Sequence, residues 1–333
     1  MEFNGIKARW LRRIGMFACV ALTALAGCGG GEQVEKFHPS RIVSFGDEAS
    51  LIVPGAGSTG GKKYTINAVD ASASAPANTI LCTGTALWNE SVASAFGLSF
   101  TACPRPGTAA NGLIYATPKA KAADVKTQID NFITTEQPFS HADVVTLMVG
   151  LYDILEQSTL YPATPEAIIT ATLRQRAKAL AEQANRIAVM GAPVIVMRLP
   201  GVGYTPYAIS QGADKAALLN RLTNAFNTEL QLNLINDGHL IGIVFGDTEI
   251  QFTLNNVSAL GLVNATAPAC TAAATATDKL DDSVLLGCTT GTLATDAAQA
   301  LATYLWAGNL MLGPYGQSRL GSLAASRAVG NPF

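Results

Sequence analysis

The sequence predicts a three-layer α/β/α fold, in which a parallel β-sheet is covered by helices on both faces. Short apolar runs rich in β-branched residues alternate with longer segments of helical apolar spacing. The short runs are continuously apolar, which is typical of strands buried on both faces. No internal repeat or interdomain linker divides the 333 residues. We therefore expect one α/β domain over residues 41–330.

Four strands and four helices are predicted, in alternation. Gly191 follows the second helix directly, as a C-cap glycine does. Residues 55–63 and 253–288 are the long irregular stretches. The expected strands are Arg41–Phe45, Val144–Val149, Val194–Leu199 and Leu240–Phe245. The expected helices are Asp124–Ile133, Leu173–Val189, Ala216–Ile235 and Ala297–Leu305.

The composition excludes several classes of protein. Hydrophobic residues make up 49% of the chain and charged residues 14%, so the chain is not disordered. The formal net charge of −2 and the lack of a basic run argue against nucleic acid as a partner. After residue 28 no apolar stretch approaches the ~20 residues that a spanning helix needs.

The N-terminus has the pattern of an export signal. Residues 1–15 carry four Lys or Arg, and an apolar stretch, Met16–Ala26, follows. Leu25-Ala26-Gly27-Cys28 then resembles a bacterial lipobox, in which cleavage precedes a cysteine that becomes lipidated. We expect residues 1–27 to be a lipoprotein signal peptide and residues 28–40 a flexible tether that begins at lipidated Cys28. The absence of Asp after Cys28 favours the outer membrane of a Gram-negative bacterium. An ordinary signal peptide with a chance cysteine is the alternative.

The four remaining cysteines would lie in an oxidising compartment, which favours disulfides. The pairs Cys82–Cys103 and Cys270–Cys288 close short loops and are favoured, while other connectivities or four free thiols remain open. No CxxC motif occurs, and no His is near either pair. We therefore expect no metal site and no cofactor.

Ligands of parallel α/β sheets bind beyond the carboxyl ends of the strands. Three segments follow predicted strands there: Ser44–Ser50, Val149–Ile154 and Arg198–Gly203.

Six segments, in order, resemble the blocks of the GDSL/SGNH ester hydrolases, in particular their secreted bacterial branch. The resemblance spans about residues 42–324 and implies the family's flavodoxin-like α/β/α fold. It also places a helix at Trp88–Leu98. The segments are Arg41–Asp47, Gly60–Thr65, Trp88–Leu98, Asp143–Leu155, Leu199–Pro206 and Tyr304–Ala307, the last with Pro314, Gly316 and Leu320 in register.

The same resemblance implies that the catalytic positions are substituted. Glu48 stands where the family has its nucleophilic Ser, and Tyr152 stands where it has the oxyanion-binding Asn. Gly308 and Met311 stand where it has Asp and His. The segment expected to supply an oxyanion-binding glycine contains Pro118 and Lys119 and no Gly. Met cannot accept a proton and Gly cannot orient an imidazole, so no intact catalytic set is expected.

No histidine is placed to replace the missing base. His38, His141 and His239 each precede a predicted strand, at the amino edge of the sheet. A strand of five to six residues spans ~17–20 Å, so these imidazoles should lie far from the carboxyl edge.

Two functions follow as hypotheses. The first is a non-catalytic protein that binds or scaffolds an envelope polysaccharide, peptidoglycan or a protein partner while a lipid on Cys28 holds it at the membrane. The alternative is an ester hydrolase that acts near Glu48, through clustered carboxylates or a serine such as Ser50. The residues expected to line the old cleft are Asp47, Glu48, Tyr115, Tyr152, Asp153, Trp306 and Met311.

Overall fold

The computed structural model describes residues 37–55, 60–72, 75, 79–235, 238, 240–293 and 300–330. The expected signal peptide, Cys28 and most of the expected tether, residues 28–36, lie outside these residues, as does His239. No helix in the described ranges is both long enough and apolar enough to span a bilayer.

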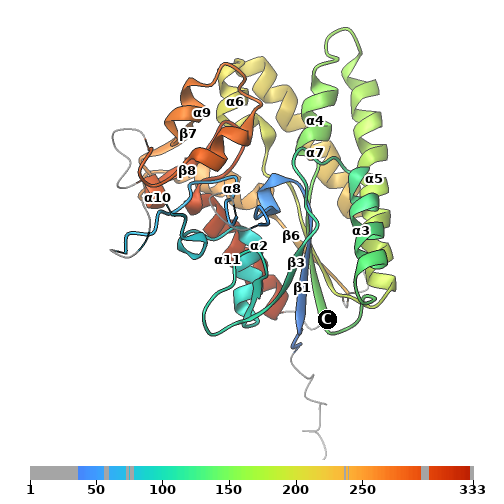
Figure 1. Cartoon of the computed structure of the whole chain (residues 1–333). Helices are drawn as coiled ribbons and strands as arrows, with labels where there is room; N and C mark the ends of the chain where they lie inside the picture. Colours follow the sequence, from blue (N-terminus) through green and yellow to red (C-terminus); the bar gives the residue numbers. More distant parts are fainter. Residues whose placement is uncertain are drawn as a thin grey trace, which may run out of the picture. The chain divides into compact units, whose positions relative to one another are not determined.

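A six-stranded sheet forms the centre, with every neighbouring pair parallel (Figure 1). The strand order is β2-β3-β1-β4-β5-β6, which adds one edge strand to the flavodoxin-like order 2-1-3-4-5. The predicted fold class is confirmed. The strands are β1 Arg41–Gly46, β2 Leu98–Phe100, β3 Ala109–Ile114, β4 Asp143–Met148, β5 Val194–Met197 and β6 Ile241–Val244.

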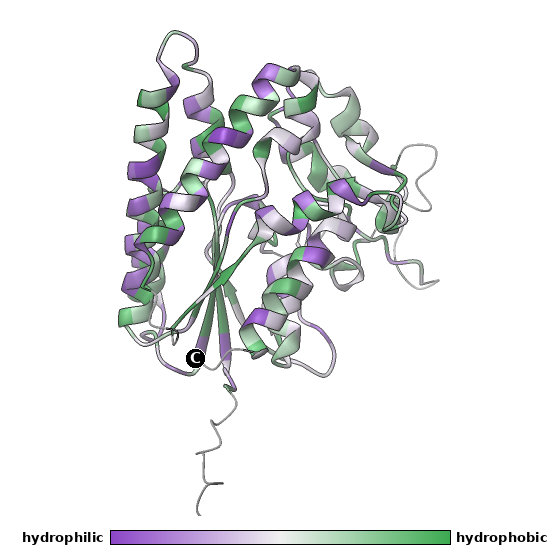
Figure 2. Ribbon diagram, turned by 180° about the vertical axis from the view of Figure 1, so that it is seen from behind, coloured by the Kyte–Doolittle hydropathy of each residue, from purple (hydrophilic) through white to green (hydrophobic). Residues whose placement is uncertain are grey.

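Helices cover both faces of this sheet. Figure 1 shows α2 (Trp88–Ala95) and α11 (Pro314–Gly330) on one side, and α3 (Asp124–Thr135), α5 (Glu166–Val189) and α7 (Ala213–Asn233) on the other. Figure 2 shows green, apolar strands between helices whose outer faces carry the purple residues. This double cover explains the continuously apolar strands. The remaining helices are α4 Leu151–Ser158, α6 Pro206–Ser210, α8 Gly246–Asn255, α9 Thr271–Thr275 and α10 Ala300–Thr303.

The central strands are almost fully buried, and their few polar side chains are hydrogen-bonded to one another. All six residues of β4 are buried. Within the core, the Ser44 and Thr146 hydroxyls are in contact, and Asn89 Nδ2 donates to Ser44 Oγ over 2.7 Å. Such pairing avoids the cost of unsatisfied buried polar groups.

Three predicted elements differ from the structure. The predicted helix Trp88–Leu98 ends at Ala95, because Gly97 adopts φ 69° and Leu98 begins β2. The predicted helix Ala297–Leu305 is instead α10 followed by strand β8 (Tyr304–Trp306), although residues 297–299 lie outside the described ones. The stretch predicted as irregular, residues 253–288, contains β7 (Asn264–Pro268), which pairs with β8, as well as α9 and the 3-10 helix η4 (Asp282–Gly287).

Both predicted disulfides are confirmed. Cys82 pairs with Cys103 and Cys270 pairs with Cys288, with Cα atoms 5.8 Å and 5.9 Å apart. The second disulfide ties the start of α9 to the end of η4.

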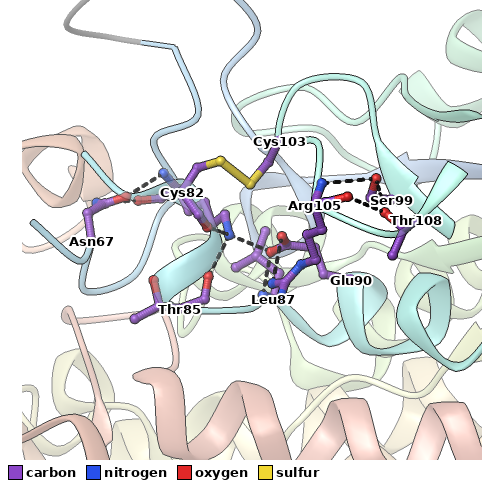
Figure 3. Close-up of a disulfide and its surroundings, with 10 residues drawn as sticks. Asn67, Cys82, Thr85, Leu87, Glu90, Ser99, Cys103, Arg105 and Thr108 are labelled. Carbon is purple, nitrogen blue, oxygen red and sulfur yellow. Dashed lines mark hydrogen bonds and ion pairs between the residues drawn. A yellow bond between two sulfur atoms is a disulfide. The ribbon is translucent and has the colours of Figure 1, made fainter. Parts of the chain in front are cut away.

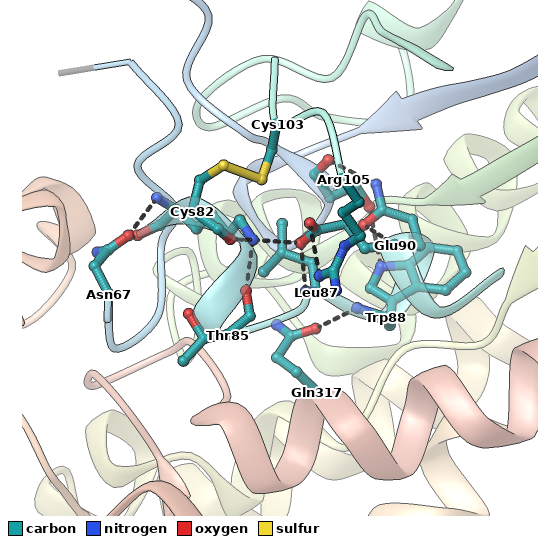
Figure 4. A network of polar contacts seen from close by, with 12 residues as sticks. Asn67, Cys82, Thr85, Leu87, Trp88, Glu90, Cys103, Arg105 and Gln317 are labelled. Atoms are coloured by element: carbon teal, nitrogen blue, oxygen red, sulfur yellow. Dashed lines mark hydrogen bonds and ion pairs between the residues drawn. A yellow bond between two sulfur atoms is a disulfide. The ribbon is translucent and has the colours of Figure 1, made fainter. Parts of the chain in front are cut away.

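A buried ion pair lies beside the first disulfide (Figures 3 and 4). Lys63 Nζ is 2.6 Å from Glu90 Oε2, and both side chains are almost fully buried. The same ammonium donates to the carbonyl oxygens of Cys82 (2.6 Å) and Thr85 (2.5 Å). Glu90 Oε2 also accepts from the Leu87 N–H at the start of α2 over 2.7 Å. Burial lowers the pKa of Lys63. The pair therefore fixes the segment between β1 and α2 to the first turn of α2.

Replacing Glu90 with Gln should lower the free energy of unfolding by about 3 kcal/mol, because the Lys63 charge would stay buried without its partner. Urea denaturation measures this. Asp130 forms surface ion pairs with Lys126 and Arg186 and supplies the control, since Asp130→Asn should leave stability nearly unchanged. Equal effects of the two substitutions would contradict the assignment.

Candidate functional site

Two glycine turns bring the ends of β1 and β4 together. Gly46 has φ 131°, and a Cβ there would lie 2.0 Å from the carbonyl oxygen of Met148. Gly150 has φ 129°, and a Cβ there would lie 2.7 Å from the ring of Phe226. The first turn leads into the 3-10 helix η1 (Glu48–Ser50) and the second into α4. Glycine at both positions therefore lets the two segments meet at the carboxyl edge.

Glu48 and Tyr152 are hydrogen-bonded to each other at this edge. Tyr152 Oη donates to Glu48 Oε1 over 2.8 Å. Glu48 is 1% exposed and Tyr152 8%. The positions that the family resemblance assigns to the nucleophile and to an oxyanion donor are thus joined by a direct contact. Little of either side chain is accessible to a substrate.

Lys119 approaches the same carboxylate. It has φ 57°, in the left-handed region that favours glycine, and it belongs to the segment expected to supply the family's oxyanion glycine. Burial raises the pKa of Glu48, while the backbone amides of Glu48 and Lys119 and the hydroxyl of Tyr152 oppose that rise. Two groups at the predicted oxyanion-binding positions, the Lys119 amide and the Tyr152 hydroxyl, therefore act on the Glu48 carboxylate. Glu48 Oε2 has no hydrogen-bond partner among the described residues.

Asp282 is a member of this site that the sequence did not indicate. It is 2% exposed and lies in η4, inside the stretch predicted as irregular. A Cβ at Gly308 would lie 2.9 Å from Asp282 Oδ1, so a carboxylate from another segment fills the space beside Gly308. The only signal was an Asp281-Asp282 pair before an apolar run, and such pairs also begin ordinary helices.

Three buried carboxyls thus influence one another at the carboxyl edge. Burial, followed by the charge of Glu48, raises the pKa of Asp47 and of Asp282 well above the usual range. Like charges in a dry environment disfavour one another, so simultaneous ionisation of all three carboxyls is disfavoured. No cluster of three or more His, Cys, Asp or Glu residues in the described ranges could hold a metal ion.

Asp47 and Asp153 bind backbone amides. Asp47 Oδ1 accepts from the Ala49 N–H over 3.1 Å and caps η1. Asp153 Oδ2 accepts from the Ala122 N–H over 2.8 Å, and its Oδ1 is 3.0 Å from Arg176 Nη1. These contacts hold the loops that carry Glu48 and Lys119.

The residues expected to line one cleft lie in separate places. Met311 and Trp306 are buried, and both line a small cavity that Asp47 also borders. Tyr115 instead lines an open groove beside Pro118, and its hydroxyl contacts Thr135 Oγ1 over 2.8 Å. The residues expected in a single pocket therefore line two separate hollows, and neither hollow is lined by Glu48 or Tyr152.

No alternative serine or histidine machinery is assembled in the described residues. Ser50 is fully buried and accepts from Trp88 Nε1 over 3.1 Å. His38 and His141 precede β1 and β4 and are exposed, at the opposite end of the strands from Glu48.

The open groove has a volume of about 570 Å³. Its floor includes Tyr115 and Leu51, with Pro118 at the rim. One face of α3 supplies exposed polar side chains, since Asp124, Thr127 and Asn131 recur at helical spacing. An apolar floor beside a polar wall suits a polar ligand with apolar faces.

No family model and no curated protein matches the chain. Solved structures with a similar arrangement include the acetylxylan esterase Axe2 from Geobacillus stearothermophilus, at 11% identity and a TM-score of 0.43, covering 89% of this chain and 96% of that one. A member of the lipolytic G-D-S-L family from Veillonella parvula matches at 12% identity and a TM-score of 0.39, covering 85% and 95%.

Asp282→Asn should change how stability depends on pH. A carboxyl whose pKa is raised on folding contributes stability that is complete below its unfolded pKa of about 4 and is lost as pH rises through the folded pKa. The variant cannot ionise, so it should be more stable than the parent at pH 8 and not at pH 4. Urea denaturation at both values measures the difference.

Asp281→Asn is the matched control at the neighbouring residue. The Ser283 contacts lower the pKa of Asp281, so this variant should gain nothing at pH 8. An unchanged pH slope in Asp282→Asn would contradict the carboxylate cluster.

Proposed function

We propose that this chain is a non-catalytic binding protein of the bacterial cell envelope, built on a hydrolase-like fold and held at the outer membrane by a lipid on Cys28. The observation that carries the proposal is the buried Tyr152–Glu48 hydrogen bond. Two disulfides fit an exported protein, since they persist in oxidising compartments.

Ester hydrolysis needs a nucleophile, a base and a site for the oxyanion. The Glu48 carboxylate has no hydroxyl to acylate, and its charge would repel a developing oxyanion. The thioether of Met311 cannot accept the proton that a catalytic His would take. A carboxylate mechanism through Glu48 and Asp282 is less supported, because the two side chains are 1% and 2% exposed.

The open groove is the surface we assign to the ligand, which we propose to be an envelope glycan. Sugars present apolar faces that stack on aromatic rings and hydroxyls that bond to carboxylates and amides. The groove offers Tyr115 for the first kind of contact and Asp124 and Asn131 for the second. These side chains lie at an accessible surface of the groove, whereas the side chains around Glu48 are buried.

The full chain should hydrolyse p-nitrophenyl acetate no faster than buffer. Glu48→Ser alone should restore nothing, because the base position holds Met311 and Tyr152 would remain in the cleft. Spectrophotometric initial rates test both statements. Turnover above background that Glu48→Gln or Ser50→Ala abolishes would instead establish an active hydrolase.

Thr127→Arg should weaken glycan binding at least tenfold by placing a long side chain in the groove. Co-sedimentation with purified peptidoglycan and affinity electrophoresis in soluble envelope polysaccharide are the measurements. Tyr115→Ala should weaken binding in the same way, with the equally aromatic but distant Tyr161→Ala as control (Tyr161 is 47% exposed). If neither glycan retains the protein, or if both retain Thr127→Arg as well as the parent, the groove is not the glycan-binding site.

Cys28→Ser should abolish incorporation of a radiolabelled fatty acid and release the protein from membranes. The disulfide variant Cys82→Ser should still be labelled, which separates lipidation from the other cysteines. Label in Cys28→Ser would contradict the anchor.

A further inference from the structure

A small cavity of about 40 Å³ lies where β1, β4 and β5 end. Its walls are largely apolar. The buried apolar residues that line it include Met148, Leu151, Leu199, Val202, Trp306 and Met311. Each of these is at most 8% exposed. Ala49 and Pro200 also line it and are only half-buried, so the cavity reaches the surface between them.

One hydrogen-bond donor in the wall has no partner. Gln317 is fully buried, and its Oε1 accepts from the Trp88 N–H over 3.0 Å. Its Nε2 has no hydrogen-bond partner among the described residues. Figure 4 shows this amide nitrogen turned away from Trp88. The bond to Trp88 thus fixes the amide so that Nε2 stays free to donate. A buried donor left unpaired is costly, which points to an occupant that accepts from it.

The other polar groups of the wall limit the charge of such an occupant. Thr205 Oγ1 already donates to the Val202 carbonyl over 2.8 Å and accepts from the Ala208 N–H. No Lys or Arg lines the cavity, while Asp47 does. An anion would meet no positive charge and would lie near Glu48, so it is disfavoured. Burial, followed by the charge of Glu48, raises the pKa of Asp47 well above its usual value, which weakens its attraction for a cation.

We propose that this cavity binds a small neutral ketone, whose carbonyl oxygen accepts from Gln317 Nε2 and whose hydrocarbon part packs between Met148, Val202 and Met311. A water needs roughly 10–15 Å³ in this measure, so the volume holds about three waters or a ligand of a few heavy atoms. The site is separate from the glycan groove and does not depend on the proposed function.

Acetone is the probe, and 2-methylpropene is its control, since the two have the same shape and differ in the carbonyl oxygen. The full chain is labelled with ¹³C at its methionine methyl groups and titrated by NMR. Met148 and Met311 line the cavity, whereas Met190 at the end of α5 does not and serves as the internal control. Acetone should shift the first two signals saturably at millimolar concentration, and 2-methylpropene should bind at least threefold more weakly.

Two variants test the hydrogen bond from Gln317 and the volume of the cavity separately. Gln317→Met removes the donor and should weaken acetone binding about fivefold. Val202→Leu fills the cavity, leaves the Gln317–Trp88 bond in place, and should abolish the shifts even if Gln317→Met does not fold. Three results would overturn the proposal: no shift at Met148 and Met311, which leaves water as the only occupant; equal binding of 2-methylpropene; or full binding by Val202→Leu.

Discussion

The hydrogen bond from Tyr152 to Glu48 is the contact on which the carboxyl edge of the sheet depends. It joins the first turn after β1 to the first turn of α4, and it does so with both side chains almost fully buried. An open catalytic cleft needs these two positions apart, with solvent and substrate between them. Here the carboxylate lies against a phenol hydroxyl and near the amide of Lys119, so the donors that could stabilise a substrate oxyanion already face a side chain of the same molecule.

Burial of acidic groups is the energetic consequence of this arrangement. Burial raises the pKa of Asp47, Glu48 and Asp282, and the charge of Glu48 adds to the rise at Asp47 and Asp282. Catalysts also hold perturbed carboxyls, but they hold them where a reacting atom can reach. Glu48 and Asp282 are closed off, so the same perturbation here costs stability at high pH. The two hollows of this region are the groove along α3 and the small cavity beside Gln317. Neither is lined by Glu48 or Asp282.

The sequence predicted the central strands, the long helices and both disulfides, because each carries a strong local signal. It did not predict β2 and β3, because Leu98–Phe100 is too short to stand out and Ala109–Ile114 contains Asn111-Gly112, which is typical of a turn. The sequence identified Glu48, Tyr152 and Met311 as substituted positions but could not show that the first two are in contact. Asp282 was missed because its role comes from a long-range approach to Gly308, which no local spacing encodes.

The central claim can be tested most directly by a double-mutant cycle of Glu48→Gln and Tyr152→Phe, read as free energies of unfolding in urea at pH 7. A buried hydrogen bond to a carboxylate predicts a coupling of about 2 kcal/mol between the two substitutions. Additive effects, with no coupling beyond error, would show that the two side chains do not hold each other and that the site is not closed in this way.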